Sequence, residues 1–285
     1  MKPAPFEYHS PATLAEALDL FAQLGAEATP LAGGQSLAPL MNLRLARPTN
    51  VVDLNRIESL ASLLVQDDVL EVGALVRHAS MERSEEVHRA FPVARAVAPF
   101  IGYPAIRHRG TLVGSIAHAD PAAEWPCVAL AFDAEVTLAR AGSTRTVVAD
   151  RFFTTMLTTV REPDELITQV AFSTTFDSWG FHEFARRYGD FAVIAAAVSA
   201  RVSDDVVTEA RISLAGAGDR PMRVAAAEGV LVGRRLDRDS AAAAAEAAVD
   251  VVEPLGDIHG SAGYRRDLVG VAVQRAVVDA AQRSG

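Results

Sequence analysis

The sequence predicts an α+β fold, and two observations carry this prediction. Segments with strand and helix patterns are interspersed along the 285 residues, but the first half lacks the regular strand–helix alternation of a doubly wound parallel sheet. Neither of the two glycine-bearing loops in this half reads G-x-G-x-x-G, and no acidic residue stands at the ribose-binding position of that motif. We therefore do not expect a Rossmann-type nicotinamide site.

The first element that we expect is a helix beginning at Ser10-Pro11, since a hydroxyl residue followed by proline is typical of a helix start. Leu14, Leu18 and Phe21 lie at helical spacing after it, and Gly25 ends it. The other elements expected before residue 133 are strands at 29–32, 51–54 and 70–73 and helices at 37–43, 92–100 and 120–132.

The remainder of the chain divides into two regions at a polar turn. A β-hairpin of residues 135–138 and 144–148 and a strand at 166–172 come before this turn. Residues 176–180, Phe-Asp-Ser-Trp-Gly, contain turn-forming and polar types, so we place a domain boundary after residue 176. Beyond it we expect strands at 180–184 and 206–214 and helices at 223–231, 241–252 and 262–281.

Composition excludes several classes of protein. The formal net charge of −9 argues against nucleic acid or an anionic membrane as a partner, because either would need a basic surface. No apolar run approaches the ~20 residues of a membrane span. Residues 1–10 lack an apolar signal core, so we expect a cytoplasmic location. Lys2 is the only lysine, which excludes Walker-type nucleotide sites and pyridoxal-phosphate Schiff bases.

The most informative feature is a pair of glycine loops, Ala32-Gly33-Gly34-Gln35-Ser36 and Gly110-Thr111-Leu112-Val113-Gly114-Ser115. Glycine lets another group come close to the main chain. Successive exposed N–H groups in such a loop form a concave site for an anion, commonly a phosphate. Two such loops together predict a site for both phosphates of a dinucleotide.

Motifs around these loops are long and occur in a fixed order. Leu31–Leu37 is followed by Asn42-Leu43-Arg44 and Val52-Asp53-Leu54-Asn55, and later by Ile101–Thr111, Gly114–Glu124 and Arg186–Ala192. With these motifs the chain resembles the medium, FAD-binding subunit of molybdenum hydroxylases, the carbon monoxide dehydrogenase and xanthine dehydrogenase relatives. The resemblance covers the first two-thirds of the chain by motif and the rest by length and pattern.

The resemblance implies a two-subdomain, FAD-binding (PCMH-type) fold. Residues 1–176 would form this domain, with subdomains of roughly 1–55 and 56–176, and residues 177–285 a small C-terminal α+β domain of the CO dehydrogenase flavoprotein type. It also implies that the two loops wrap the FAD pyrophosphate with backbone N–H groups. The residues expected to bind the cofactor are Ala32, Gly33, Gly34, Gln35, Ser36, Leu37, Ile101, Gly110, Thr111, Leu112, Val113, Gly114, Ser115, His118, Asp120, Glu124, Ile167, Arg186 and Tyr188.

Several of these residues have a narrower expected role. Glu124 occupies the place of an acidic residue that accepts hydrogen bonds from the ribose or adenine side, and Ile101 and Ile167 would lie against the rings of FAD. His118 with Asp120 suggests an acid–base pair, but a histidine that fixes the local geometry of a loop or touches cofactor oxygen explains the sequence better. Arg186 is open to two interpretations, a cation near the flavin or a surface ion pair.

Val113 is the one departure from the family pattern, which has a second glycine there. If the position requires a positive φ, a β-branched residue would cost more than ~1 kcal/mol. If it requires only negative φ and room, valine shifts the phosphate slightly. We expect the second case, because the rest of the motif is intact.

The function that the resemblance implies is electron transfer. A large partner subunit would hold a molybdenum–pterin cofactor and a small partner two two-iron two-sulfur clusters, while the FAD of this chain passes electrons to an external acceptor. Cys127, the only cysteine, is a buried apolar residue in this interpretation, and no cluster can be ligated within the chain. Two alternatives stay open: a stand-alone FAD-dependent oxidoreductase, and an assembly or binding module of the same fold that has lost flavin, which Val113 alone favours.

Overall fold

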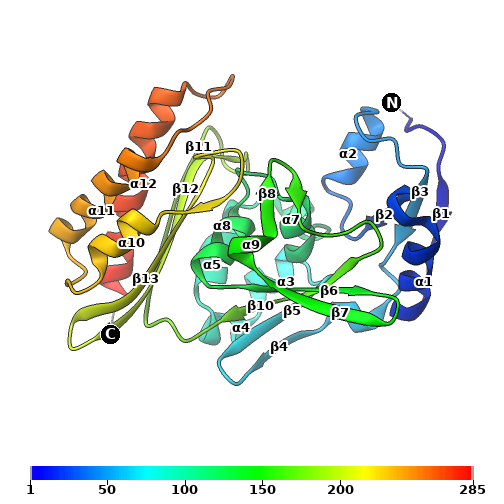
Figure 1. Ribbon diagram of the computed structural model, residues 1–285, viewed down its shortest axis with the longest axis horizontal. Coiled ribbons are helices and arrows are strands. Elements are labelled where there is room, and N and C mark those ends of the chain that lie inside the picture. The colour runs from blue at the N-terminus through cyan, green and yellow to red at the C-terminus, as the bar shows by residue number, and fades with distance from the viewer. Residues whose placement is uncertain (1, 284–285) are drawn as a thin grey trace.

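The computed structural model describes residues 2–283, so residues 1, 284 and 285 of the predicted domain ranges lie outside the described residues. Figure 1 shows three parts along the long axis of the molecule, with the N-terminal and C-terminal segments at opposite ends. Two parts precede β11, and the third begins with it. Helices and antiparallel strands are mixed in the second and third parts, which confirms the predicted α+β class. The boundary after residue 176 stays a prediction.

The N-terminal part is a small parallel sheet of strand order β1-β3-β2. Its strands are β1 (Glu7–His9), β2 (Ala28–Leu31) and β3 (Asn50–Asp53), and its helices are α1 (Leu14–Leu24) and α2 (Leu37–Asn42). The predicted helix start at Ser10-Pro11 is wrong by three residues. Thr13 is the N-cap, since its hydroxyl accepts the Glu16 N–H at 3.2 Å, and Gly25 ends the helix with a φ of +53°.

The middle part is a five-stranded antiparallel sheet covered by short helices. Its strand order is β4 (Leu63–Gln66), β5 (Val69–Gly73), β10 (Leu166–Ser173), β6 (Glu135–Arg140) and β7 (Ser143–Val148), and the predicted β6–β7 hairpin is present. The helices are α3 (His78–Arg83), α4 (Glu85–Ala90), α5 (Val93–Val97), α6 (Pro104–Arg107), α7 (Leu112–His118), α8 (Glu124–Ala131) and α9 (Ala149–Phe152). The strands β8 (Phe153–Thr155) and β9 (Thr158–Thr159) form a separate two-stranded sheet. The helix predicted at 120–132 begins only at Glu124, because a turn at Asp120 precedes it.

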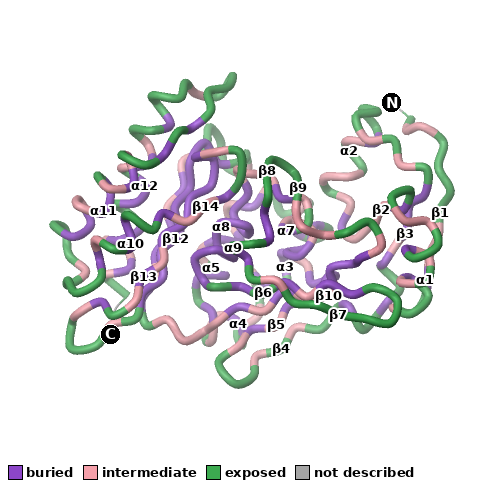
Figure 2. Tube along the Cα trace, in the orientation of Figure 1, coloured by how far each residue is buried: buried purple, intermediate pink, exposed green. Residues whose placement is uncertain are grey.

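The C-terminal part is an antiparallel sheet with helices on one face (Figure 1). Its strands are β11 (Ser178–Ala185), β12 (Ala192–Ser203), β13 (Val206–Ala215) and β14 (Met222–Arg223), and its helices are α10 (Ala225–Leu231), α11 (Arg238–Val251) and α12 (Ala262–Gln282). The sequence did not predict β12. Residues 192–200 of this strand are buried on both faces, so they show no apolar–polar alternation, as the continuous buried segment in Figure 2 illustrates.

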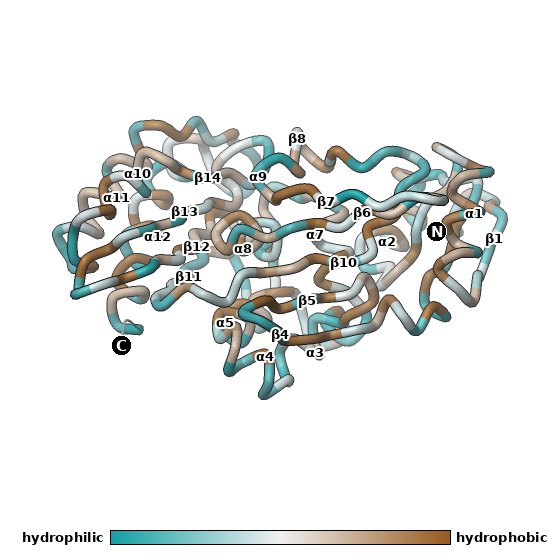
Figure 3. Tube along the Cα trace, turned by 60° about the horizontal axis from the view of Figure 1, so that its bottom comes forward, coloured by the Kyte–Doolittle hydropathy of each residue, from teal (hydrophilic) through white to brown (hydrophobic). Residues whose placement is uncertain are grey.

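Two hydrophobic clusters meet at the C-terminal sheet. One face of β12 and β13 packs in a cluster with α10, α11 and α12, whereas Ala195, Ala197 and Ala215 on the other face belong to the cluster of the first two parts. Helix α8 lies on that second face, and all eight of its residues are buried. Figure 3 shows the hydropathy of the residues along the chain, with apolar stretches along β5 and β10 and hydrophilic turns at the rim of the molecule.

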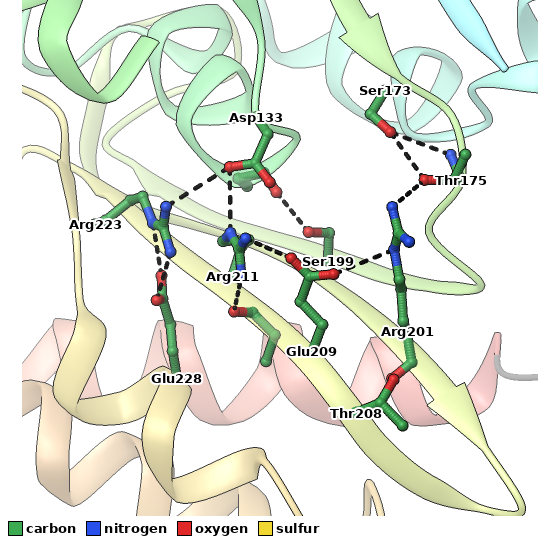
Figure 4. A network of polar contacts seen from close by, with 12 residues as sticks. Asp133, Ser173, Thr175, Ser199, Arg201, Thr208, Glu209, Arg211, Arg223 and Glu228 are labelled. Carbon is green, nitrogen blue, oxygen red and sulfur yellow. Dashed lines mark hydrogen bonds and ion pairs between the residues drawn. The ribbon is translucent and has the colours of Figure 1, made fainter. Parts of the chain in front are cut away.

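A polar network secures the end of α8 to the C-terminal sheet (Figure 4). Arg211 of β13 donates to the Asp133 carboxylate at 3.2 Å, and Arg223 lies 3.6 Å from the same carboxylate. Arg223 in turn makes two hydrogen bonds, of 2.9 and 2.7 Å, to Glu228 of α10. The Ser199 hydroxyl donates to the carbonyl oxygen of Ala131. These bonds fix the position of α8 against β12 and β13.

Among the described residues, no helix has both the length and the apolar character needed to cross a membrane.

Gly180 generates a prediction about the packing of α12 on β11. A Cβ atom at Gly180 would overlap the carbonyl oxygen of Ala276 and lie 2.7 Å from its carbonyl carbon. Gly180→Ala is therefore expected to destabilise the fold by roughly 1–3 kcal/mol, the usual cost of overpacking. Thermal unfolding measures this as a lower midpoint.

The matched control is Gly229→Ala in α10, where no heavy atom lies within 4 Å of the new Cβ. Alanine stabilises a helix interior by about 0.5–1 kcal/mol relative to glycine, so the control midpoint should rise. Equal midpoints for the two variants would contradict the close packing of α12 on Gly180.

Candidate cofactor-binding site

A cavity of about 450 Å³ lies where the N-terminal part meets the middle part. Both glycine loops line it, one from the β2–α2 connection and the other from the α6–α7 connection. Of the residues predicted to bind the cofactor, those that line the cavity are Ala32, Gly33, Gly34, Gln35, Ser36, Leu37, Ile101, Gly110, Thr111, Val113, Gly114, Ser115, His118, Asp120, Glu124 and Ile167. The fold therefore brings together most of a set that is spread over more than a hundred residues of sequence.

The two glycine loops touch each other through their main chains. A Cβ at Gly33 would overlap the carbonyl oxygen of Arg109 and lie 2.7 Å from the Cα of Gly110. Gly34 has a φ of +70°, a conformation that favours glycine. Gly33 is thus required for a close approach and Gly34 for a turn.

Two polar side chains hold the loops in this arrangement. The Asn55 amide donates to the carbonyl oxygen of Ala32 at 2.8 Å, which fixes the start of the first loop. The Arg77 guanidinium donates to the Asn55 side chain at 2.5 Å and also to the carbonyl oxygen of Arg109, at the start of the second loop. Arg77 therefore links the two loops, and no local pattern in the sequence indicates this role.

The loops differ in the number of N–H groups that remain free. In the first loop, the N–H groups of residues 33–36 donate to no acceptor in the described chain. In the second, Leu112 donates to the Val76 carbonyl, Gly114 to the Thr111 hydroxyl at 3.0 Å and Ser115 to the Thr111 carbonyl. The first loop therefore offers the larger set of main-chain donors for an anion.

Val113 is accommodated without strain. It lies inside α7, and its φ is not positive, so the positive-φ case is excluded, while the slight shift of the phosphate stays a prediction. The neighbouring position 114 requires glycine, since a Cβ there would lie 2.6 Å from the Thr111 hydroxyl oxygen. Thr111 caps α7 only because Gly114 leaves room for that oxygen.

The predicted pair His118 and Asp120 lines the cavity, but among the described residues the two side chains form no hydrogen bond or ion pair with each other. The Asp120 carboxylate accepts the N–H of Ala122 at 2.9 Å, and this local bond shapes the turn before α8. Ile101 and Ile167 are both buried and supply apolar wall. The arrangement fits a binding role for these residues and gives no sign of an acid–base dyad.

Three residues of the predicted set do not line the cavity. Leu112 is fully buried in the core behind it. Arg186 extends over the surface, 3.3 Å from a ring nitrogen of His259, and Tyr188 is exposed and packs edge-on against Tyr103. Their loop reaches the cavity through Gly189, Asp190 and Phe191 instead.

The cavity also has lining residues that the sequence did not single out. His78, Ile106, Arg161, Leu166 and the exposed ring of Phe191 are among them. Arg161 donates to the carbonyl oxygens of Glu162 and Glu165, at 3.0 and 2.6 Å, and so closes its own loop. Ile106 and Phe191 stand in the motifs Ile101–Thr111 and Arg186–Ala192, and Leu166 begins a predicted strand, whereas no motif marks His78 or Arg161.

Glu124, which lines the cavity, and Glu183 form a pair of buried carboxyl groups. Glu124 begins α8 and is 4% exposed, and burial, reinforced by Asp120, raises its pKa to about 7. Glu183 on β11 lies opposite Ala195 of β12, which lies opposite Ala215 of β13. Residues opposite one another in a sheet share a face, so Glu183 lies on the face that α8 covers. Burial and then the Glu124 carboxylate raise the pKa of Glu183 to about 9, and its Oε2 atom has no hydrogen-bond partner in the described chain.

These features define an α+β protein whose two glycine loops contact each other and line one cavity. A family described as "FAD binding domain in molybdopterin dehydrogenase" matches residues 4–173, and one described as "CO dehydrogenase flavoprotein C-terminal domain" matches residues 179–280. The chain belongs to the FAD-binding medium-subunit family of the molybdenum hydroxylases, which confirms the resemblance and identifies FAD as the cofactor of this chain.

Individual relatives extend over the full length of the chain. The nicotine 6-hydroxylase medium subunit of Paenarthrobacter nicotinovorans is 39% identical, with all of both chains covered. The carbon monoxide dehydrogenase medium chain of Hydrogenophaga pseudoflava is 34% identical over 97% of each chain. A solved carbon monoxide dehydrogenase from the same organism superposes with a TM-score of 0.96 over all of both chains, and quinoline 2-oxidoreductase from Pseudomonas putida 86 with 0.93 over 99% of each, at 35% identity. The family therefore consists of oxidoreductase subunits.

The buried carboxyl pair generates a prediction about pH. Both pKa values are raised above the ordinary value of 4.5, so the folded chain binds more protons than the unfolded chain between that pH and about 9. The stability that these groups contribute is complete below pH 4.5 and is lost as the pH rises through 7 toward 9. Glutamine is a neutral isostere of glutamate. Near pH 9, the Glu183→Gln variant is therefore expected to be more stable than the wild type by roughly 1–3 kcal/mol.

Urea unfolding over this pH range measures the effect, with Glu246→Gln on the exposed face of α11 as the control. The control should follow the wild-type curve throughout. A Glu183→Gln curve parallel to that of the wild type would show that Glu183 does not titrate in this range.

Proposed function

We propose that FAD occupies the cavity with its pyrophosphate between the two glycine loops. The volume of about 450 Å³ lies within the range of small-molecule pockets, roughly 300–1,000 Å³. The free N–H groups of residues 33–36 suit phosphate oxygens, and Ile101 and Ile167 suit the faces of aromatic rings. This combination of free donors and apolar wall is the observation that carries the proposal.

The residues proposed to hold FAD are those of the predicted set that line the cavity. Bound FAD would supply the capacity to accept an electron pair and to release it to an acceptor. The chain itself contributes binding and orientation: the loops fix the phosphates, and Glu124 offers a buried carboxyl group to a hydroxyl group. A catalytic acid–base pair is not required for such a role, which agrees with the surroundings of His118 and Asp120.

We further propose that the chain transfers electrons within a multi-subunit molybdenum hydroxylase. Its relatives are named medium subunit, medium chain and complex subunit. A two-iron two-sulfur cluster needs four ligands, whereas Cys127 is the only cysteine and is buried against Ser213. The clusters and the molybdenum–pterin cofactor therefore belong, in this proposal, to a small and a large partner, and the chain passes electrons to an external acceptor. A cytoplasmic location stays a prediction.

The two alternatives receive less support. A flavin-less module was favoured only by Val113, and its helical conformation removes that argument. A stand-alone oxidoreductase would need a substrate pocket in addition to the FAD site. The proposed electron-transfer role requires no such pocket in this chain.

The proposed site predicts that Gly33→Ala weakens FAD binding by at least about tenfold, because the new Cβ would push the two loops apart. Equilibrium titration of the purified chain with FAD gives the affinity, and circular dichroism verifies the fold. Gly263→Ala, which has no atom within 4 Å of its Cβ, is the control and should bind FAD as the wild type does. A folded Gly33→Ala chain with unchanged affinity would refute the proposed placement.

The electron-transfer role predicts a difference between the complex and the isolated chain. When the chain is purified together with its molybdenum and iron–sulfur partners, substrate of the complex should bleach the visible absorbance of FAD without oxygen present. The isolated, FAD-loaded chain should not be bleached by that substrate. Bleaching of the isolated chain would favour the stand-alone enzyme instead.

A further inference from the structure

His78 begins α3 beneath the second glycine loop, and its ring lines the cavity. The side chain is 5% exposed and lies directly against Gly110, since a Cβ at Gly110 would be 2.8 Å from Cδ2 and 2.9 Å from Nε2 of the imidazole. The His78 N–H also donates to the Gly110 carbonyl at 3.0 Å. His78 and the second loop therefore form one wall of the cavity.

Trp125 of α8 determines which ring nitrogen of His78 carries the proton. The indole N–H can only donate, and it lies 3.0 Å from Nδ1 of His78. Nδ1 must therefore accept, and the proton of a neutral imidazole stands on Nε2. The same bond fixes the ring orientation, because a flipped ring would place a C–H group against the indole N–H. No described residue accepts a hydrogen bond from Nε2.

The surroundings keep His78 neutral. Burial first, and then the positive charges of Arg107 and Arg77, lower its pKa to about 3. The ring therefore presents the same Nε2–H donor throughout the neutral range. Titration of His78 does not affect the site under ordinary conditions.

We propose that His78 is a further binding residue of the FAD site, whose Nε2–H donates to an oxygen of the cofactor pyrophosphate beside Gly110. Four main-chain N–H groups of the second loop, those of Gly110, Leu112, Gly114 and Ser115, already have partners inside the protein, so this wall has few donors of its own. His78 supplies one, and Trp125 acts as a positioning residue that holds the tautomer. The inference rests on the proposed placement of the pyrophosphate between the loops.

Two variants of the full chain separate the donor from the packing of the ring. His78→Asn keeps an acceptor for the Trp125 N–H but has no donor at the Nε2 position, whereas His78→Gln places an amide nitrogen near it. The probes are FAD and ADP, which shares the pyrophosphate. His78→Asn is expected to weaken both by about 10- to 100-fold, as for a hydrogen bond to a charged group, and His78→Gln by less than about threefold.

A phosphorus NMR spectrum of bound ADP supplies a readout that a purely structural role would not change. Its resonances should shift in His78→Asn and keep their wild-type positions in His78→Gln. If His78→Asn does not fold, nitrogen NMR of the wild type decides: the Nε2 proton of His78 should shift when ADP binds, and an unchanged signal overturns the proposal.

The two proposals fail in different ways. A chain that binds FAD normally after His78→Asn overturns the role of His78 and leaves the FAD site intact. A wild-type chain that binds neither FAD nor ADP overturns the proposed function itself. Loss of FAD binding with unchanged ADP binding also overturns the present inference, because His78 would then contact another part of the cofactor.

Discussion

The burial of helix α8 is the constraint on which the other features of this structure depend. Its first residue, Glu124, reaches the cavity, and the next, Trp125, fixes the imidazole of His78. Two residues later, Cys127 packs against Ser213 of β13, and Asp133 beyond the helix accepts a hydrogen bond from Arg211. Because α8 has no exposed face, its side chains must pack against neighbouring elements on every side. The cavity wall and the C-terminal sheet are therefore positioned by one element.

The cavity itself depends on main-chain contact between segments far apart in sequence. Gly33 lies on the carbonyl group of Arg109, and Arg77 bonds to both loop regions through Asn55 and that carbonyl. The walls are chemically unequal. The N–H groups of residues 33–36 in the first loop have no acceptor among the described residues, whereas most N–H groups of the second loop donate to carbonyl or hydroxyl oxygens of the protein. A side-chain donor such as His78 is useful on the second wall for this reason.

Local sequence was sufficient where the chemistry is local. Glycine loops, the β6–β7 hairpin and the apolar periods of α11 and α12 follow from turn geometry and helical spacing, and the structure contains them. Prediction failed where burial came from distant segments. Strand β12 is covered on both faces, so it carries no alternation, and Thr13 replaces Ser10 as the cap of α1 because the chain turns later than its proline suggests. Arg77, His78 and Arg161 stand in no motif, so only their neighbours in the fold reveal them.

The sequence by itself determined the class of fold, the two glycine loops and the family, because glycine geometry and ordered motifs are properties of contiguous residues. It did not determine which loop keeps its N–H groups available for binding or which carboxyl groups hold a proton. Glu124 and Glu183 are 59 positions apart, and their pKa values rise only because α8 and β11 enclose them together. The tertiary structure decided these properties, since desolvation and hydrogen-bond partnership depend on what surrounds a group in space.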